Sequence, residues 1–148
     1  MLLRYLSLLL VLGVGGFAFE ASNYVSYGVG PGGVSVSVGR REQVERLGWD
    51  LDARIFAGTE TNYVQGSASA MVFYGIGYSG LGPALGYNHD PEAWGKKKFY
   101  GSLAPELTQG VMLGDKSFIE LRVLGPAYHS SGTHRIVPIG SISYGYRF

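Results

Sequence analysis

The sequence predicts an all-β fold, an eight-stranded antiparallel transmembrane β-barrel with short loops, and three observations support this. Long stretches alternate apolar with polar or small side chains at a period of two, as strands with two different faces do. The chain ends in such a strand, residues 142–148, and its last residue is an aromatic, Phe148. The 24 glycines and 11 tyrosines among 148 residues are typical of tight turns and aromatic girdles.

The terminal strand carries the clearest signal. Its two faces are Ile142, Tyr144, Tyr146 and Phe148 on one side and Ser143, Gly145 and Arg147 on the other. On a soluble protein this apolar strand would be an aggregation hazard, whereas in a membrane barrel the apolar face meets lipid. The strand resembles the last strand of bacterial outer-membrane β-barrels. The resemblance implies that Tyr144, Tyr146 and Phe148 belong to the signal read by the barrel-assembly machinery.

The N-terminus predicts export. Residues 1–18 combine an early cation, Arg4, with an apolar run over residues 6–14 and small residues at Gly16 and Ala18. This pattern is typical of a secretory signal peptide cleaved after Ala18, and the run is shorter than the roughly 20 residues of a spanning helix. An uncleaved anchor helix is the alternative. Residues 19–148 would then form one barrel domain, and the absence of cysteine is compatible with an exported protein.

The first four strands are expected at residues 21–29, 34–40, 47–57 and 62–72. The turn at residues 30–33, Gly-Pro-Gly-Gly, supplies the backbone freedom that a tight hairpin needs. The third strand is the most regular, with an apolar face from Leu47 to Ala57. The charged stretch 41–46 is expected to be a link outside the membrane. The turn between the fourth and fifth strands lies within residues 73–80, where the pattern does not locate it.

The last four strands are expected at residues 81–87, 98–111, 117–128 and 136–148. If the N-terminus starts on the periplasmic side, an even number of strands returns the C-terminus to that side. The loops at 30–33, 58–61, 88–97 and 129–135 then face outward. These loops are short, which disfavours an elaborate recognition surface.

Three prolines fall inside expected strands. Pro83, Pro105 and Pro138 each lack a ladder donor, so each should mark a bulge or a strand end. A soluble lipocalin-like barrel or sandwich is therefore the structural alternative. It does not account for the outward aromatic stripe of the terminal strand.

Seven charged residues fall on the face assigned to the lumen, namely Asp50, Asp52, Arg54, Glu106, Glu120, Arg122 and Arg147. An eight-stranded barrel is just wide enough for side chains to fill it, and buried charges require partners. The sequence therefore predicts a salt-bridge network that seals the lumen. A narrow path for ions or protons is the functional alternative.

One short motif suggests catalysis. His129-Ser130-Ser131 places a histidine two residues before a serine, so both side chains share a strand face. The motif resembles a fragment of the lipid A deacylase family of eight-stranded outer-membrane barrels. The resemblance makes His129 the base and Ser131 the nucleophile. However, Gly132 stands where that family has Asn, and the last strand offers no acidic residue to orient the histidine.

The remaining polar clusters predict no metal or cofactor. His89, Asp90 and Glu92, with His129 or His134, follow no recognised metal spacing. Lys96, Lys97 and Lys98, beside aromatic residues, could hold anionic lipid headgroups or simply anchor the barrel at the interface.

As a whole the chain resembles the small outer-membrane barrels of the OmpA, OmpX and NspA kind. The resemblance implies a monomer in the bacterial outer membrane whose partners are membrane lipid and the assembly machinery. A net charge of +1 argues against nucleic acid as a partner. The function expected is non-enzymatic: envelope structure, lipid contact or weak surface interaction. The alternatives are a lipid hydrolase that uses His129 and Ser131, and a narrow pore.

Overall fold

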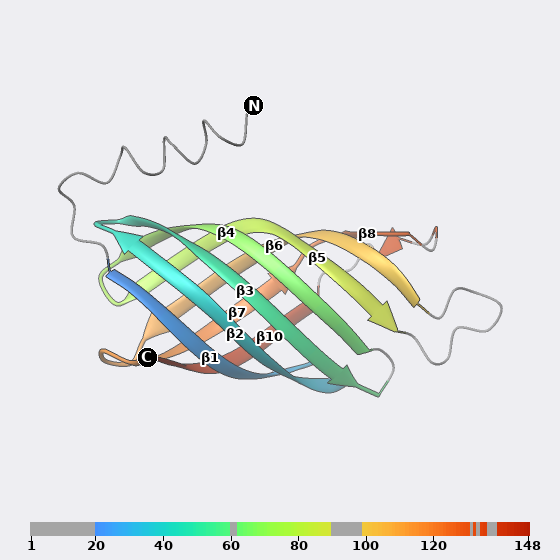
Figure 1. Ribbon diagram of the computed structural model, residues 1–148, viewed down its shortest axis with the longest axis horizontal. Helices are drawn as coiled ribbons and strands as arrows, with labels where there is room; N and C mark the ends of the chain where they lie inside the picture. Colours follow the sequence, from blue (N-terminus) through green and yellow to red (C-terminus); the bar gives the residue numbers. More distant parts are fainter. Residues whose placement is uncertain (1–19, 60–61, 90–98, 131, 133, 136–138) are drawn as a thin grey trace, which may run out of the picture.

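The protein is a closed antiparallel β-barrel (Figure 1). The computed structural model describes residues 20–59, 62–89, 99–130, 132, 134–135 and 139–148. Their strands are β1 (Glu20–Gly30), β2 (Gly33–Val44), β3 (Leu47–Gly58), β4 (Asn62–Tyr74), β5 (Gly77–His89), β6 (Phe99–Met112), β7 (Ser117–Leu124), β8 (Ala127–His129), β9 (His134–Arg135) and β10 (Ile139–Arg147).

Eight of these strands form the wall. Neighbours in sequence pair from β1 to β7, β10 pairs with β7, and β1 pairs with β10 to close the barrel. The short β8 and β9 pair with each other, and β8 continues alongside β6. The predicted all-β, eight-stranded antiparallel barrel is therefore confirmed. None of the described residues belongs to a helix long and apolar enough to cross a membrane.

The barrel has two distinct ends (Figure 1). At one, called the terminal end here, lie the start of β1, the C-terminus and the turns β2–β3, β4–β5 and β6–β7. At the other, called the loop end, lie the turn β1–β2 and the ends of β3, β5 and β8. Residues 90–98, which include Lys96, Lys97 and Lys98, lie outside the described residues.

One turn lies where the sequence pattern predicted it, and another lies in a stretch where the pattern could not locate it. Gly32 in the turn β1–β2 has φ 72°, a conformation that glycine adopts without strain, as expected. The turn between β4 and β5 is Gly75-Ile76, and Gly75 has φ 62°. The predicted link over residues 41–46 was too long, because β2 continues to Val44 and pairs with its neighbours, which leaves residues 45–46 as the turn.

The prolines lie at irregularities in the wall. Pro83 and Pro105 face each other across β5 and β6. Beside Pro83 the β4–β5 ladder skips one stretch, residues 82–83. Beside Pro105, residues 104–105 of β6 oppose three residues, 125–127, so the neighbouring strand bulges between β7 and β8. The missing donors therefore cost few hydrogen bonds. Pro138 lies outside the described residues.

The two faces of the wall differ in chemistry, as the alternation predicts. Large apolar side chains are exposed on the outer face of every wall strand, among them Val36, Leu51, Val64, Leu85, Leu107, Leu121 and Ile142. Inside, an aromatic cluster fills the terminal end, made of Tyr24, Met71, Phe73, Tyr78 and Phe118. Small and apolar side chains, Ala84, Ala104, Leu124 and Ala127, pack together nearer the loop end. Between these two clusters the inner face is charged.

Candidate functional site: the charged lumen

Seven charged side chains meet inside the barrel and are called the charged lumen below. They are Arg41, Asp50, Asp52, Arg54, Glu106, Glu120 and Arg122, each 6% exposed or less. They come from β2, β3, β6 and β7. Strand alternation turns all of them inward, so the barrel closure itself brings together residues that are far apart in sequence.

Arg122 is the hub of the charged lumen. Its Nε donates to Glu120 Oε1 at 2.5 Å, and its Nη2 donates to Asp50 Oδ2 at 3.1 Å. Its Nη1 lies 3.1 Å from both Asp52 Oδ1 and Glu106 Oε1. Nη2 also donates to the hydroxyl of Tyr24 at 2.9 Å. One guanidinium therefore contacts all four carboxylates and ties β7 to β3, β6 and β1.

Arg41 joins the network from the terminal end. Its Nη2 donates to Asp50 Oδ2 at 3.2 Å and to Glu120 Oε2 at 2.9 Å. Its guanidinium carbon also lies 4.3 Å from the ring centroid of Tyr78, with the rings of Tyr24 and Phe118 nearby. Because the charged run 41–46 was expected to be an external link, Arg41 was not among the residues predicted to face the lumen. The inward alternation Ser35, Ser37, Gly39 simply continues to Arg41.

Arg54 completes the set from the loop end. Its Nη2 donates to Asp52 Oδ1 at 3.3 Å, and its Nη1 donates to Glu106 Oε2 at 3.2 Å. The amide of Gln65 donates to the same oxygen of Glu106 at 2.9 Å. Every charge in the charged lumen thus has an opposite charge within reach, which is the condition for burying ions at all.

The ion pairs of the charged lumen span the interior of the barrel. Four of these ion pairs run across the interior from β2 and β3 to β6 and β7. The aromatic cluster lies directly beside it at the terminal end, where the Tyr78 hydroxyl donates to Glu120 Oε2 at 2.8 Å. Contacts between opposite sides of the wall are what the small diameter of an eight-stranded barrel predicts.

Arg147, the seventh residue assigned to the lumen from sequence, lies at the terminal end. Its Nε donates to Ser22 Oγ at 2.7 Å, and its Nη1 lies 4.0 Å from the sulfur of Met112. The aromatic residues assigned to the assembly signal, Tyr144, Tyr146 and Phe148, are exposed on the outer face. The backbone N–H of Phe148 donates to the carbonyl of Asn23 at 2.9 Å, so the last residue is held against β1.

The structure describes only part of the proposed catalytic pair. The ring of His129 packs on Tyr100 at the loop end, with centroids 4.9 Å apart. Ser131 lies outside the described residues, so its pairing with His129 stays a prediction. The hydroxyl of the neighbouring Ser130 accepts a hydrogen bond from the Gly101 backbone at 2.9 Å.

The other histidine candidate, His89, stacks on Phe99 with centroids 4.4 Å apart. In the described part of the chain, no three histidine or acidic side chains are grouped so that they could hold a metal ion.

Comparison with known proteins shows the fold. No protein-family model matches this chain, and no curated protein does. The structure is similar to the crystal structure of Neisserial surface protein A (NspA), with a TM-score of 0.50 and 18% sequence identity. The similarity covers 90% of this chain and 96% of that one. The expected likeness to small barrels of the NspA kind is therefore confirmed, and at this identity it concerns the architecture.

Proposed function

We propose that this protein is an integral outer-membrane barrel with no catalytic activity and no conducting pore, which supports the envelope and contacts its lipids. The charged lumen carries the proposal. A pore needs a continuous path of water, whereas here one arginine contacts four carboxylates across the interior. A barrel filled in this way acts through its outer surface and its ends.

The outer surface supports a membrane location. Large apolar side chains such as Val38, Ile55, Leu81 and Leu103 are about half exposed or more. A soluble protein rarely exposes a continuous apolar surface of this extent. In lipid, the closed barrel satisfies the backbone hydrogen bonds and leaves no strand edge.

Cell fractionation tests the location. The full chain, expressed in a double-membraned bacterium, should appear in the outer-membrane fraction and migrate faster in SDS gels when unheated than when boiled. Mass spectrometry should give a mature chain that begins at Phe19. A soluble periplasmic product, or a chain that keeps residues 1–18 as an anchor, would contradict the proposal.

Planar-bilayer recording tests the closed lumen. The purified barrel should insert without discrete conductance steps, and flotation of the same preparation with vesicles confirms insertion. Reproducible steps from inserted protein would mean that water passes the charged lumen, and the pore alternative would replace the proposal.

Lipid hydrolysis is tested separately. The barrel, incubated with outer-leaflet lipid, should release no fatty acid. Release that Ser131→Ala abolishes and Ser130→Ala preserves would establish the hydrolase alternative, because the Ser130 hydroxyl already accepts a backbone hydrogen bond.

A further inference from the structure

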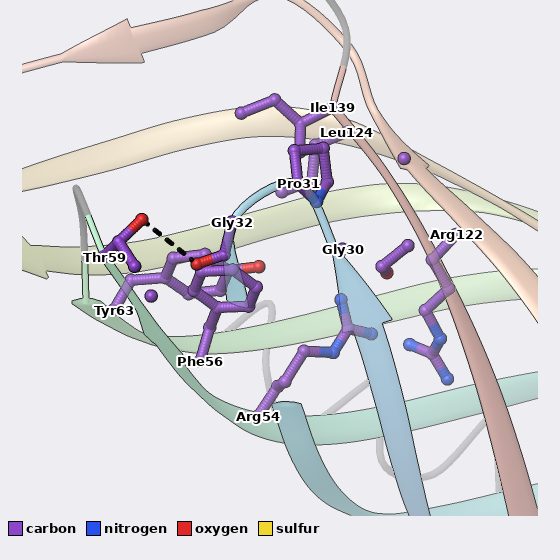
Figure 2. A pocket seen from close by; sticks show the side chains of 13 residues that line it. Gly30, Pro31, Gly32, Arg54, Phe56, Thr59, Tyr63, Arg122, Leu124 and Ile139 are labelled. Carbon is purple, nitrogen blue, oxygen red and sulfur yellow. Dashed lines mark hydrogen bonds between the residues drawn. The ribbon is translucent and has the colours of Figure 1, made fainter. Parts of the chain in front are cut away.

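The loop end of the barrel contains a cavity next to the charged lumen, which is called the vestibule below (Figure 2). It has a volume of about 290 Å³. Its lining comes from the turn β1–β2 and from the inner faces of β3, β4, β7 and β10. Because five parts of the wall contribute to it, the vestibule is a product of barrel closure and not a gap beside one loop.

The walls of the vestibule are apolar. Phe56 and Tyr63 stack with ring centroids 4.8 Å apart and planes 6° from parallel. Leu124 and Ile139 lie on the other side of the vestibule from this aromatic pair (Figure 2). Carbon surface of this kind, inside an enclosed space, is what a ligand pocket offers for the apolar part of a molecule.

Arg54 and Arg122 lie deeper in the vestibule, where it meets the charged lumen (Figure 2). The donor capacity of Arg122 is fully used, since its three nitrogens contact the four carboxylates and Tyr24. Arg54 directs Nη1 and Nη2 to Glu106 and Asp52. The guanidinium of Arg54 has five N–H groups, and its third partner is the Tyr63 hydroxyl, which also lines the vestibule, so donor capacity for a further acceptor remains.

The volume limits the ligand. It lies at the lower end of small-molecule pockets, roughly 300 Å³ and above. It is nearly twice the engineered cavity of about 150 Å³ that binds benzene. A chain of about eight carbons or one to two rings would therefore fill the space.

The charge of the neighbouring network selects the head group. Three arginines face four carboxylates in the charged lumen, so its formal charge is −1. A second anion would compete with Asp52 and Glu106 for Arg54 and would lose its own hydration. A ligand ammonium group would be repelled by the guanidinium of Arg54, the nearest charge in the vestibule. An uncharged group with an acceptor oxygen avoids both penalties.

We propose that the vestibule is a binding site for an uncharged amphiphile, with an apolar body of about eight carbons and one acceptor oxygen directed at Arg54. This goes beyond the proposed function, because it holds for a barrel that neither conducts nor catalyses. The apolar body would displace poorly satisfied water from carbon surface, and the oxygen would occupy the remaining donor capacity of Arg54.

Two glycines provide a matched pair of variants. A Cβ at Gly30 would lie 3.4 Å from the Gly140 carbonyl oxygen and from Ser141 Cβ, and 3.5 Å from Phe56 Cε2, so it meets the lining of the vestibule at ordinary contact distances. A Cβ at Gly140 would instead approach the outward Leu121 and Val123, at 3.8 Å and 4.0 Å. Gly30→Leu therefore fills the vestibule, while Gly140→Leu adds the same side chain outside it.

The experiment titrates the full barrel, held in phospholipid nanodiscs, with octan-1-ol and with octanoate at matched free concentrations. The methyl NMR signals of Leu124 and Ile139 report binding. We expect a saturable shift with octan-1-ol in the wild type and in Gly140→Leu, and none in Gly30→Leu. Octanoate should bind about tenfold more weakly or worse, because of the network charge.

Three results would overturn the proposal. They are the absence of a saturable shift in the wild type, a Gly30→Leu titration equal to that of the wild type, and octanoate binding as tightly as octan-1-ol. Heat-dependent gel migration establishes that each variant is folded. If Gly30→Leu does not fold, Ile139→Trp fills the same space and leaves Leu124 as the reporter.

Discussion

Replacing Arg122 by methionine removes the hub of the charged lumen while keeping much of the side-chain volume. The wild-type network holds three arginines and four carboxylates, and Arg122→Met leaves two arginines for the same four carboxylates. The formal charge of the buried cluster thus changes from −1 to −2. Asp50, Asp52 and Glu106 each lose one partner, and Glu120 loses the shortest, at 2.5 Å.

Removing one partner of a buried ion pair costs about 3–5 kcal/mol, mostly because the other charge stays buried without compensation. We expect Arg122→Met to lower the free energy of unfolding by at least that amount, since four carboxylates share this arginine. The measurement is equilibrium unfolding by urea in phospholipid vesicles, followed by tryptophan fluorescence and by heat-dependent gel migration, with the transition midpoint and slope both fitted.

Two further variants make the test specific. Arg40→Met removes an exposed arginine whose Nη2 lies 2.8 Å from Glu42 Oε1, and it should cost about 1 kcal/mol or less. Adding Glu120→Gln to Arg122→Met removes one stranded carboxylate and should recover part of the loss. A loss below about 1 kcal/mol for Arg122→Met, or equal losses for Arg122→Met and Arg40→Met, would refute the reasoning.

Three other variants give outcomes of known direction. Gly82→Ala should destabilise the barrel by about 1–3 kcal/mol in the same urea assay, because its Cβ would lie 1.8 Å from the Ala68 carbonyl oxygen. Gly101→Ala meets nothing closer than 3.7 Å and should stay within about 0.5 kcal/mol of wild type, and a large loss there would contradict the glycine argument. Phe118→Ala empties a fully buried position and should cost about 3–5 kcal/mol, whereas an unchanged midpoint would show that the aromatic cluster is not packed. Deleting Phe148 should reduce the fraction of heat-modifiable barrel in cells, and an unchanged fraction would remove Phe148 from the assembly signal.

The period-two pattern was enough to predict the wall and much of its inner face. It placed Asp50, Asp52 and Arg54 on the same face of one strand, and the structure turns all three inward. It failed at Arg41 because a run of charged residues favours a solvated link. Here the arginine is instead buried by carboxylates from β3 and β7 that the local sequence does not reveal.

Other features depend on contacts between strands and so lie beyond a sequence pattern. The sequence shows Pro83 and Pro105 as isolated defects, and only the register shows that they face each other beside a bulge. The turn at Gly75-Ile76 lies in a stretch where glycine and tyrosine recur without a clear face. The vestibule needs the closed wall, because Phe56 and Ile139 meet its space from strands far apart in the chain.

The closure of the barrel also bears on how the chain reaches its native state. Most wall strands pair with their sequence neighbours, but closure must bring Tyr24 beside Arg147, across almost the whole described chain. Local hairpins form early because they order short loops, and this last pairing carries the largest loop-closure entropy. A closure displaced by two residues would keep every apolar side chain facing lipid, so hydrophobicity alone does not reject it. The same displacement would break the ion pairs that cross the lumen, such as Arg41–Glu120 and Arg122–Asp50, and would leave part of the buried charge without its partner, which is costly. Buried ion pairs that add little to stability when correctly formed would thus select, during folding, the one closure register in which all of them form.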